Sequence, residues 1–141
     1  MAPGVRRAKS LDPAKVSLLR EALAFALFFR HALALERLRV QAGPRPAVER
    51  ARRLGAAQRR RSELARRTLR RVISFVDRHW SGGANCYRRV LFEVGLDGAA
   101  AGEIVQLGFQ GSGEIGSGHA WLERGDASDD GGRTYDAIVS I

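Results

Sequence analysis

The stretch SGGANCYRRVL at residues 81–91 divides the chain into two parts of different composition. Its two glycines end the helical pattern before them, and Asn85 is a residue type that caps the start of a new helix. Residues 1–71 hold 19 Lys and Arg against 5 Asp and Glu, whereas residues 72–141 hold 5 against 10. Of the 16 glycines, 13 follow residue 80. We therefore expect a helical first part and a second part that contains a sheet.

Helical spacing of apolar residues predicts three helices before this stretch. The first has a typical start, because Asp12 can cap it and proline follows at its first position. The third has one apolar face and one face that is almost entirely arginine. These helices are expected at about residues 13–40, 46–54 and 56–80, after a loose basic arm at residues 1–12.

One further helix and a small sheet are expected after residue 85. The helix covers about residues 86–95, with Val90, Leu91 and Val94 turned inward, and β-like runs follow at residues 103–109, 118–124 and 134–141. A polar connection with several glycines joins the last two runs, which is typical of a hairpin. Helices followed by strands predict an α+β fold, in which N-terminal helices pack on a core with a short antiparallel sheet.

The length of 141 residues suits a single domain, 1–141, with a helical part at 13–80 and a catalytic core at 81–141. The longest apolar run, residues 22–29, is far shorter than the roughly 20 residues of a membrane span. No signal-peptide pattern is present at the N-terminus, and one cysteine cannot form an internal disulfide. We therefore expect a cytoplasmic protein without a membrane span.

Cys86 is the first candidate for chemistry. It stands at the predicted start of a helix, where the helix dipole and unpaired backbone N–H groups favour a thiolate. A small buried core residue is the alternative interpretation. His119 opens a predicted strand after a glycine-rich stretch, and a thiolate nucleophile needs such a general base within about 3 Å.

Asp136 completes a candidate Cys–His–Asp triad. Folding the predicted hairpin about residues 127–128 places Asp136 opposite His119, where a carboxylate can orient the imidazole. Asp126, Asp129 and Asp130, in the connection, are alternatives for this role. His119 and Asp136 can also be exposed strand residues without a catalytic role.

The segments around these residues resemble the transglutaminase-like cysteine proteases that mature lasso peptides. The similarity rests on NCYRRVL at residues 85–91 and HAWLE at 119–123, followed by Asp136, and extends forward to LLREAL at 18–23. It is closer to the stand-alone form, in which the protease and the leader-recognition protein are separate chains. The resemblance implies a papain-like site with Cys86 as nucleophile, His119 as base and Asp136 as orienting residue. For the oxyanion, the Cys86 backbone N–H is the candidate donor.

The resemblance also implies a substrate and partners. The substrate is a ribosomally made precursor, from which the protease removes the leader peptide, and the partners are a separate leader-binding protein and a macrocycle-forming cyclase. This chemistry needs no cofactor. One cysteine and scattered histidines give no zinc pattern either.

Arginines within residues 50–71 are the basis of an alternative function, a non-enzymatic basic module that binds nucleic acid or an acidic protein. They can also form an ordinary solvated helix face, or a dock for the leader-binding protein. No Phe, Trp or Tyr lies between Arg30 and Phe75, so a stacking platform for single strands is absent and nucleic acid is disfavoured. The arginines concerned are Arg50, Arg52, Arg53, Arg59, Arg60, Arg61, Arg66, Arg67, Arg70 and Arg71.

Overall fold

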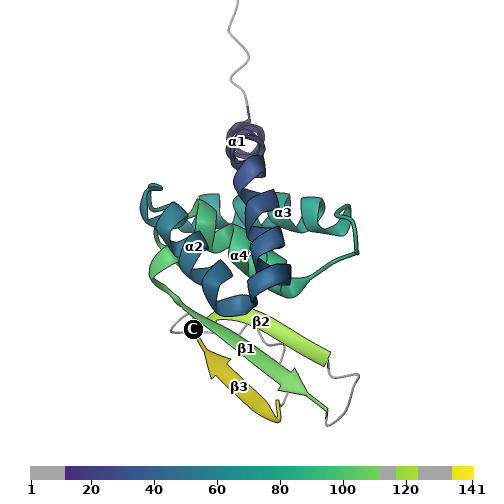
Figure 1. The fold of residues 1–141 in the computed structure, drawn as a ribbon. Coiled ribbons are helices and arrows are strands. Elements are labelled where there is room, and N and C mark those ends of the chain that lie inside the picture. Colours follow the sequence, from purple (N-terminus) through teal and green to yellow (C-terminus); the bar gives the residue numbers. More distant parts are fainter. Residues whose placement is uncertain (1–11, 112–116, 124–134) are drawn as a thin grey trace, which may run out of the picture.

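The structure is a computed structural model that describes residues 12–111, 117–123 and 135–141. The fold is α+β, as predicted, with a layer of helices on a three-stranded antiparallel sheet (Figure 1). The elements in chain order are α1 (Pro13–Ala42), α2 (Pro44–Ala56), α3 (Glu63–Arg78), α4 (Cys86–Leu96), the short 3₁₀ helix η1 (Ala100–Gly102), β1 (Ile104–Gln110), β2 (Ser117–Glu123) and β3 (Ala137–Ser140). None of the described helices is long and apolar enough to cross a membrane.

Local sequence explains where the helices begin. Oxygen atoms of the Asp12, Ser62 and Asn85 side chains accept hydrogen bonds from the first turns of α1, α3 and α4. Gly43 alone separates α1 from α2, with a φ of 89° that other residues rarely adopt. Helix α2 begins two residues earlier than predicted, because Pro44 occupies its first position, where a missing N–H costs nothing.

Helix α1 has the predicted position, but three of the leucines at helical spacing in its first half lie outside. Leu19, Leu23 and Leu27 are 68%, 61% and 76% exposed. The buried side instead carries Phe25 and Phe28, whose rings meet Phe92 of α4 edge to face at centroid distances of 5.6 and 6.3 Å. Aromatic rings remove more apolar surface from water than leucines do, and these rings lie in the core together with Leu35 of the same helix.

In the sheet, β1 lies in the centre, with β2 on one side and β3 on the other. Gly108 of β1 pairs with His119 on β2 and with Ile138 on β3. The predicted hairpin between the last two strands is therefore wrong, because β1 separates them. The central position goes to β1, which carries the buried Val105 and Leu107, whereas every residue of β3 is exposed.

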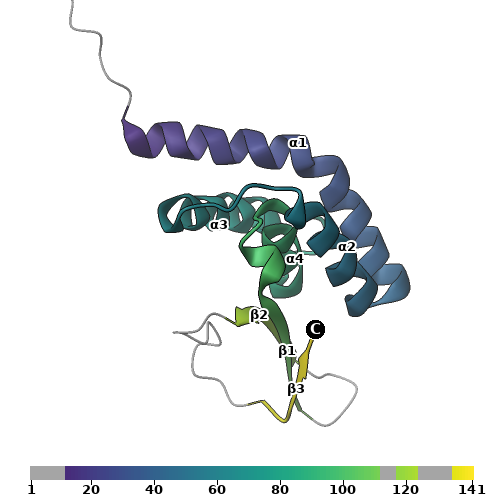
Figure 2. The same ribbon diagram turned by 90° about the vertical axis from the view of Figure 1, so that its left-hand side faces the viewer.

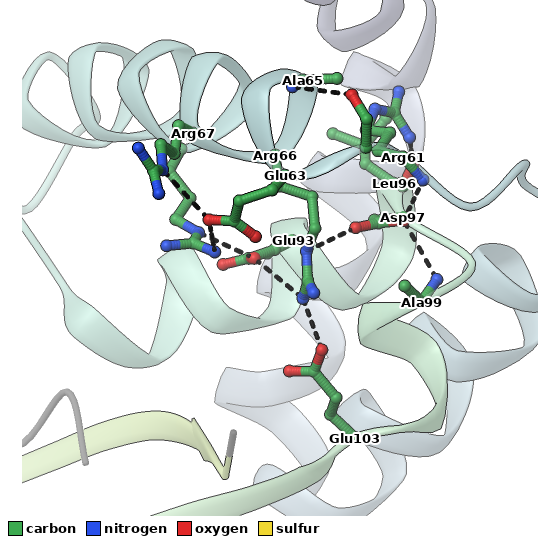
Figure 3. A network of polar contacts seen from close by, with 12 residues as sticks. Arg61, Glu63, Ala65, Arg66, Arg67, Glu93, Leu96, Asp97, Ala99 and Glu103 are labelled. Carbon is green, nitrogen blue, oxygen red and sulfur yellow. Dashed lines mark hydrogen bonds and ion pairs between the residues drawn. The ribbon is translucent and has the colours of Figure 1, made fainter. Parts of the chain in front are cut away.

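The arginine-rich segment is not the uniform solvated face that its sequence suggests. Arg66 of α3 forms ion pairs with Asp97 at 2.9 Å and Glu103 at 2.6 Å (Figure 3). Arg61 pairs with Glu21 at 2.8 Å, and Arg52 donates to the carbonyl groups of residues 103 and 141. These arginines join elements to one another. The arginines of the set that remain exposed are Arg50, Arg53, Arg59, Arg60, Arg67 and Arg71.

Replacing Arg66 by Met should lower the free energy of unfolding by about 3–5 kcal/mol, because the fully buried Asp97 carboxylate loses its ion-pair partner. Urea denaturation measures this change. Arg67→Met is the matched control one residue along α3. The Arg67 side chain is 68% exposed and pairs with the exposed Glu63, so its loss should cost at most about 0.5 kcal/mol. Equal losses in the two variants would show that the buried network does not stabilise the fold.

Candidate active site

Cys86 is the first residue of α4 and is partly exposed. The chain reaches it through Gly82 and Gly83, both with positive φ, which redirect the backbone between the end of α3 and the start of α4. The Cys86 Sγ lies 3.8 Å from the carbonyl oxygen of Gly118, the residue before His119 on β2. The fold therefore brings the start of α4 against the strand that carries the predicted base.

The start of α4 is held by Asp77, a fully buried residue near the end of α3. Its carboxylate accepts the Asn85 backbone N–H, at 2.9 Å to one oxygen and 3.2 Å to the other. It also pairs with Arg88 at 2.8 Å and Arg89 at 3.1 Å. We did not single out Asp77 from the sequence. The available signal is its position four residues after the buried Ile73, on the apolar face of α3.

Two backbone N–H groups at the start of α4 are available to a ligand. The N–H of Arg88 donates to the Asn85 side chain at 3.1 Å, and that of Arg89 donates to the Asn85 carbonyl at 3.1 Å. Within the described residues, the N–H groups of Cys86 and Tyr87 have no such acceptor. They lie at the positive end of the helix dipole, where a negatively charged oxygen is stabilised.

His119 lies in a stack of aromatic rings. Its imidazole is 5.8 Å from the Trp121 ring and 6.3 Å from the Tyr135 ring, with interplanar angles of 21° and 2°. His119 and Trp121 share one face of β2, because side chains alternate and Ala120 belongs to the core on the other face. The position of Tyr135 beside them depends on the tertiary structure. Tyr135 lies over Gly108, where any Cβ would come within 2.6 Å of its ring.

Two cavities meet at Cys86 and His119. The charged cavity, of about 630 Å³, lies between α3, α4 and β2, and the apolar cavity, of about 430 Å³, lies between the turn from α1 to α2, the start of α4 and the sheet. Cys86, His119 and Ala120 line both. The charged cavity is defined by Glu63, Arg67, Arg70, Arg89 and Glu93, and the apolar cavity by Pro44, Tyr87, Leu107 and Phe109.

Asp136 lies outside both of these cavities. Its carboxylate accepts the Gly111 N–H at 2.7 Å, at the end of β1, and its own N–H donates to the Phe109 carbonyl at 2.9 Å. Because β1 separates β2 from β3, the residue level with His119 on β3 is Ile138. The structure thus brings Cys86 and His119 to shared cavities and places Asp136 two residues before that level. Asp126, Asp129 and Asp130 lie outside the described residues.

Comparisons with protein-family models, with curated proteins and with solved structures found no match to this chain. The site consists of a cysteine at the N-terminus of α4 and a histidine on β2 that line the same two cavities, within an α+β fold.

Replacing Asp77 by Asn should lower the free energy of unfolding by about 3–5 kcal/mol, because the buried Arg88 loses a charged partner. Urea denaturation of the purified chain measures this change. Asp12→Asn is the control. Asp12 caps α1 at an exposed position, and Asn caps a helix about as well, so we expect a change below about 0.5 kcal/mol. A loss for Asp77→Asn no larger than the control's would contradict its role in holding α4.

Burial raises the pKa of Glu93, in the wall of the charged cavity, from 4.5 to about 7, although Arg70 and Arg66 oppose the shift. The folded chain therefore keeps a proton that the unfolded chain releases, and stability should fall as pH rises from about 4.5 to 7. The free energy of unfolding should fall by about 3 kcal/mol over this range, because one pKa unit corresponds to about 1.4 kcal/mol. Urea midpoints across this range should fall less steeply in Glu93→Gln. Glu63→Gln, at a 58% exposed side chain, should keep the original slope, and an unchanged slope in Glu93→Gln would refute the assignment.

Proposed function

We propose that this chain is a cysteine protease in which the Cys86 thiolate attacks a peptide carbonyl. The observation that carries the proposal is that Cys86 of α4 and His119 of β2 line the same two cavities. The Cys86 Sγ contacts the carbonyl oxygen of Gly118, and the proposed reaction requires the His119 imidazole to turn toward it from its stack with Trp121 and Tyr135. A thiolate at a helix N-terminus beside a histidine is an arrangement that covalent acyl transfer uses. The α+β fold is compatible with the transglutaminase-like core that the sequence resemblance implies.

The outer edge of β2 supports an extended peptide as the substrate. Val105 exchanges both backbone hydrogen bonds with Ile141, which follows β3. Because backbone groups alternate in direction along a strand, odd-numbered residues of β1 face β3 and even-numbered residues face β2. Gly108 therefore directs its backbone groups toward β2, where it pairs with His119. It follows that the backbone groups of Ala120 point away from β1, toward the outer edge of the sheet. An extended peptide can pair with such an edge as an added strand. Its scissile carbonyl would then lie beside Cys86.

In the proposed reaction, the Cys86 sulfur bonds to the carbonyl carbon, and the Cys86 and Tyr87 N–H groups stabilise the oxyanion. His119 gives a proton to the leaving amine as the C–N bond breaks, which leaves a thioester. His119 then takes a proton from water, whose oxygen attacks the thioester and releases the carboxylic acid and Cys86. The orienting role of Asp136 stays a prediction from the sequence; in the structure its carboxylate accepts the Gly111 N–H.

The proposed substrate is the leader peptide of a ribosomally made precursor, and this part of the proposal rests on the NCYRRVL and HAWLE motifs. A separate leader-binding protein and a cyclase are the proposed partners. The exposed Arg60, Arg67 and Arg71 are the proposed binding surface for the leader-binding protein or for an acidic leader. For the alternative of a basic binding module, Arg52, Arg61, Arg66 and Arg70 are engaged inside the protein, so such a surface would consist of the six exposed arginines.

Alkylation of Cys86 by iodoacetamide tests whether Cys86 and His119 act together, and it needs no known substrate. Cys86 should react readily at pH 7, and His119→Ala should slow the reaction about tenfold or more, because the histidine assists formation of the thiolate. His79→Ala is the control, since His79 is exposed at the end of α3 and bonds to the Phe75 carbonyl. An inert Cys86, or equal rates in the two histidine variants, would defeat the proposal.

Cleavage of the precursor is the second readout of the same prediction. Cys86→Ala should keep the urea midpoint of the original chain and lose cleavage by about a thousandfold or more, measured by mass spectrometry with the leader-binding protein present. Cleavage by Cys86→Ala at the original rate would rule out Cys86 as the nucleophile.

A further inference from the structure

The first half of α1 is apolar on two opposite sides. The inner side places Phe25 and Phe28 in the core, whereas Leu19, Leu23 and Leu27 on the outer side are more than 60% exposed. A helix that is apolar all round is normally covered all round. Figure 2 shows α1 along the outside of the helical layer, with α3 beneath it and no described element above it. An unpartnered apolar face of this kind marks an interaction site.

Charge on this side of α1 has one sign. Lys15, Arg30 and Arg37 are exposed. Both carboxylates of α1 are used within the protein: Glu21 is fully buried and pairs with Arg61, and Glu36 pairs with Arg39 at 2.7 Å and with Arg88 at 3.3 Å. The outer face of α1 therefore combines leucines with positive charges, whereas the Glu21 and Glu36 carboxylates point toward the rest of the protein.

The exposed leucines have the spacing of a helix-packing surface. Leu19, Leu23 and Leu27 follow one another at four-residue intervals, which forms a ridge along the helix. The small side chains of Ala22 and Ala26 lie beside this ridge and are also exposed. Such a ridge with small neighbours allows the backbone of a second helix to approach closely.

We propose that the outer face of α1 around Leu19, Leu23 and Leu27 binds an amphipathic helix of a partner polypeptide, with an apolar stripe flanked by carboxylates. A second copy of this chain fits poorly, because two sets of basic side chains would meet. The segment 1–11 is disfavoured for the same reason, since it carries Arg6, Arg7 and Lys9 and no acid. The proposal concerns a surface remote from Cys86 in sequence and does not depend on the proposed chemistry.

Two synthetic helical peptides, labelled with a fluorophore, test this surface by anisotropy. Both carry leucines along one face, and their flanks are glutamate in one peptide and lysine in the other. The acidic peptide should bind the full chain, and added salt should weaken it. The double variant Leu23→Ser/Leu27→Ser should bind it at least about tenfold more weakly, equivalent to about 1.4 kcal/mol. Ile138→Ser should bind like the original chain, because Ile138 is 55% exposed on β3, which lies on the opposite side of the helical layer from the first half of α1 (Figure 2).

Other outcomes would overturn the proposal. They are no binding of the acidic peptide, equal binding of the lysine peptide, or equal binding by the double variant. Light scattering that shows a dimer which the double variant abolishes would assign the face to a second copy. Co-sedimentation with phosphatidylserine vesicles that the double variant abolishes would assign it to a lipid surface. Because the substituted leucines are exposed, the double variant should keep the original thermal midpoint, which confirms that it is folded.

Discussion

The buried guanidinium of Arg88 is the interaction on which the arrangement of the helices depends. From α4 it pairs with Asp77 of α3 at 2.8 Å and with Glu36 of α1 at 3.3 Å, and it lies over the Trp80 ring at 5.3 Å. A charge that is 98% buried is tolerated only with such partners, so the three helices have to meet at this point. Cys86 is two residues away on α4, and its position follows from this contact.

The uneven distribution of charge along the chain has a structural use. Arg66 and Arg70, from the basic first part, pair with Asp97, Glu103 and Glu93 from the acidic second part. These pairs join α3 to α4 and to the start of the sheet, and Figure 3 shows those of Arg66. A basic composition therefore does not by itself indicate a nucleic-acid surface, because part of the charge neutralises carboxylates inside the same domain.

The candidate site has different surroundings on its two sides. Cys86 and His119 stand between the charged cavity and the apolar cavity, with the outer edge of β2 alongside. An extended peptide that crosses them would place its two halves in unlike environments, which gives the site a preferred direction of binding. In this arrangement the specificity of the site would depend on α3 and on the turn from α1 to α2 as much as on the residues that react.

Local sequence patterns were enough to predict the α+β class, the helix starts at Asp12 and Asn85, and the position of Cys86 at a helix N-terminus, whereas the third helix begins at Glu63 and not at residue 56 as predicted. These features depend on hydrogen bonds and side-chain spacing within one or two turns, and a local pattern is enough to predict them. The strand order, the pairing of Ile138 instead of Asp136 at the position of His119, the buried side of α1 and the contacts of Asp77 all depend on tertiary packing. Each of these depends on which distant apolar surfaces and charges compete for the same buried space, and no local pattern encodes the result of that competition.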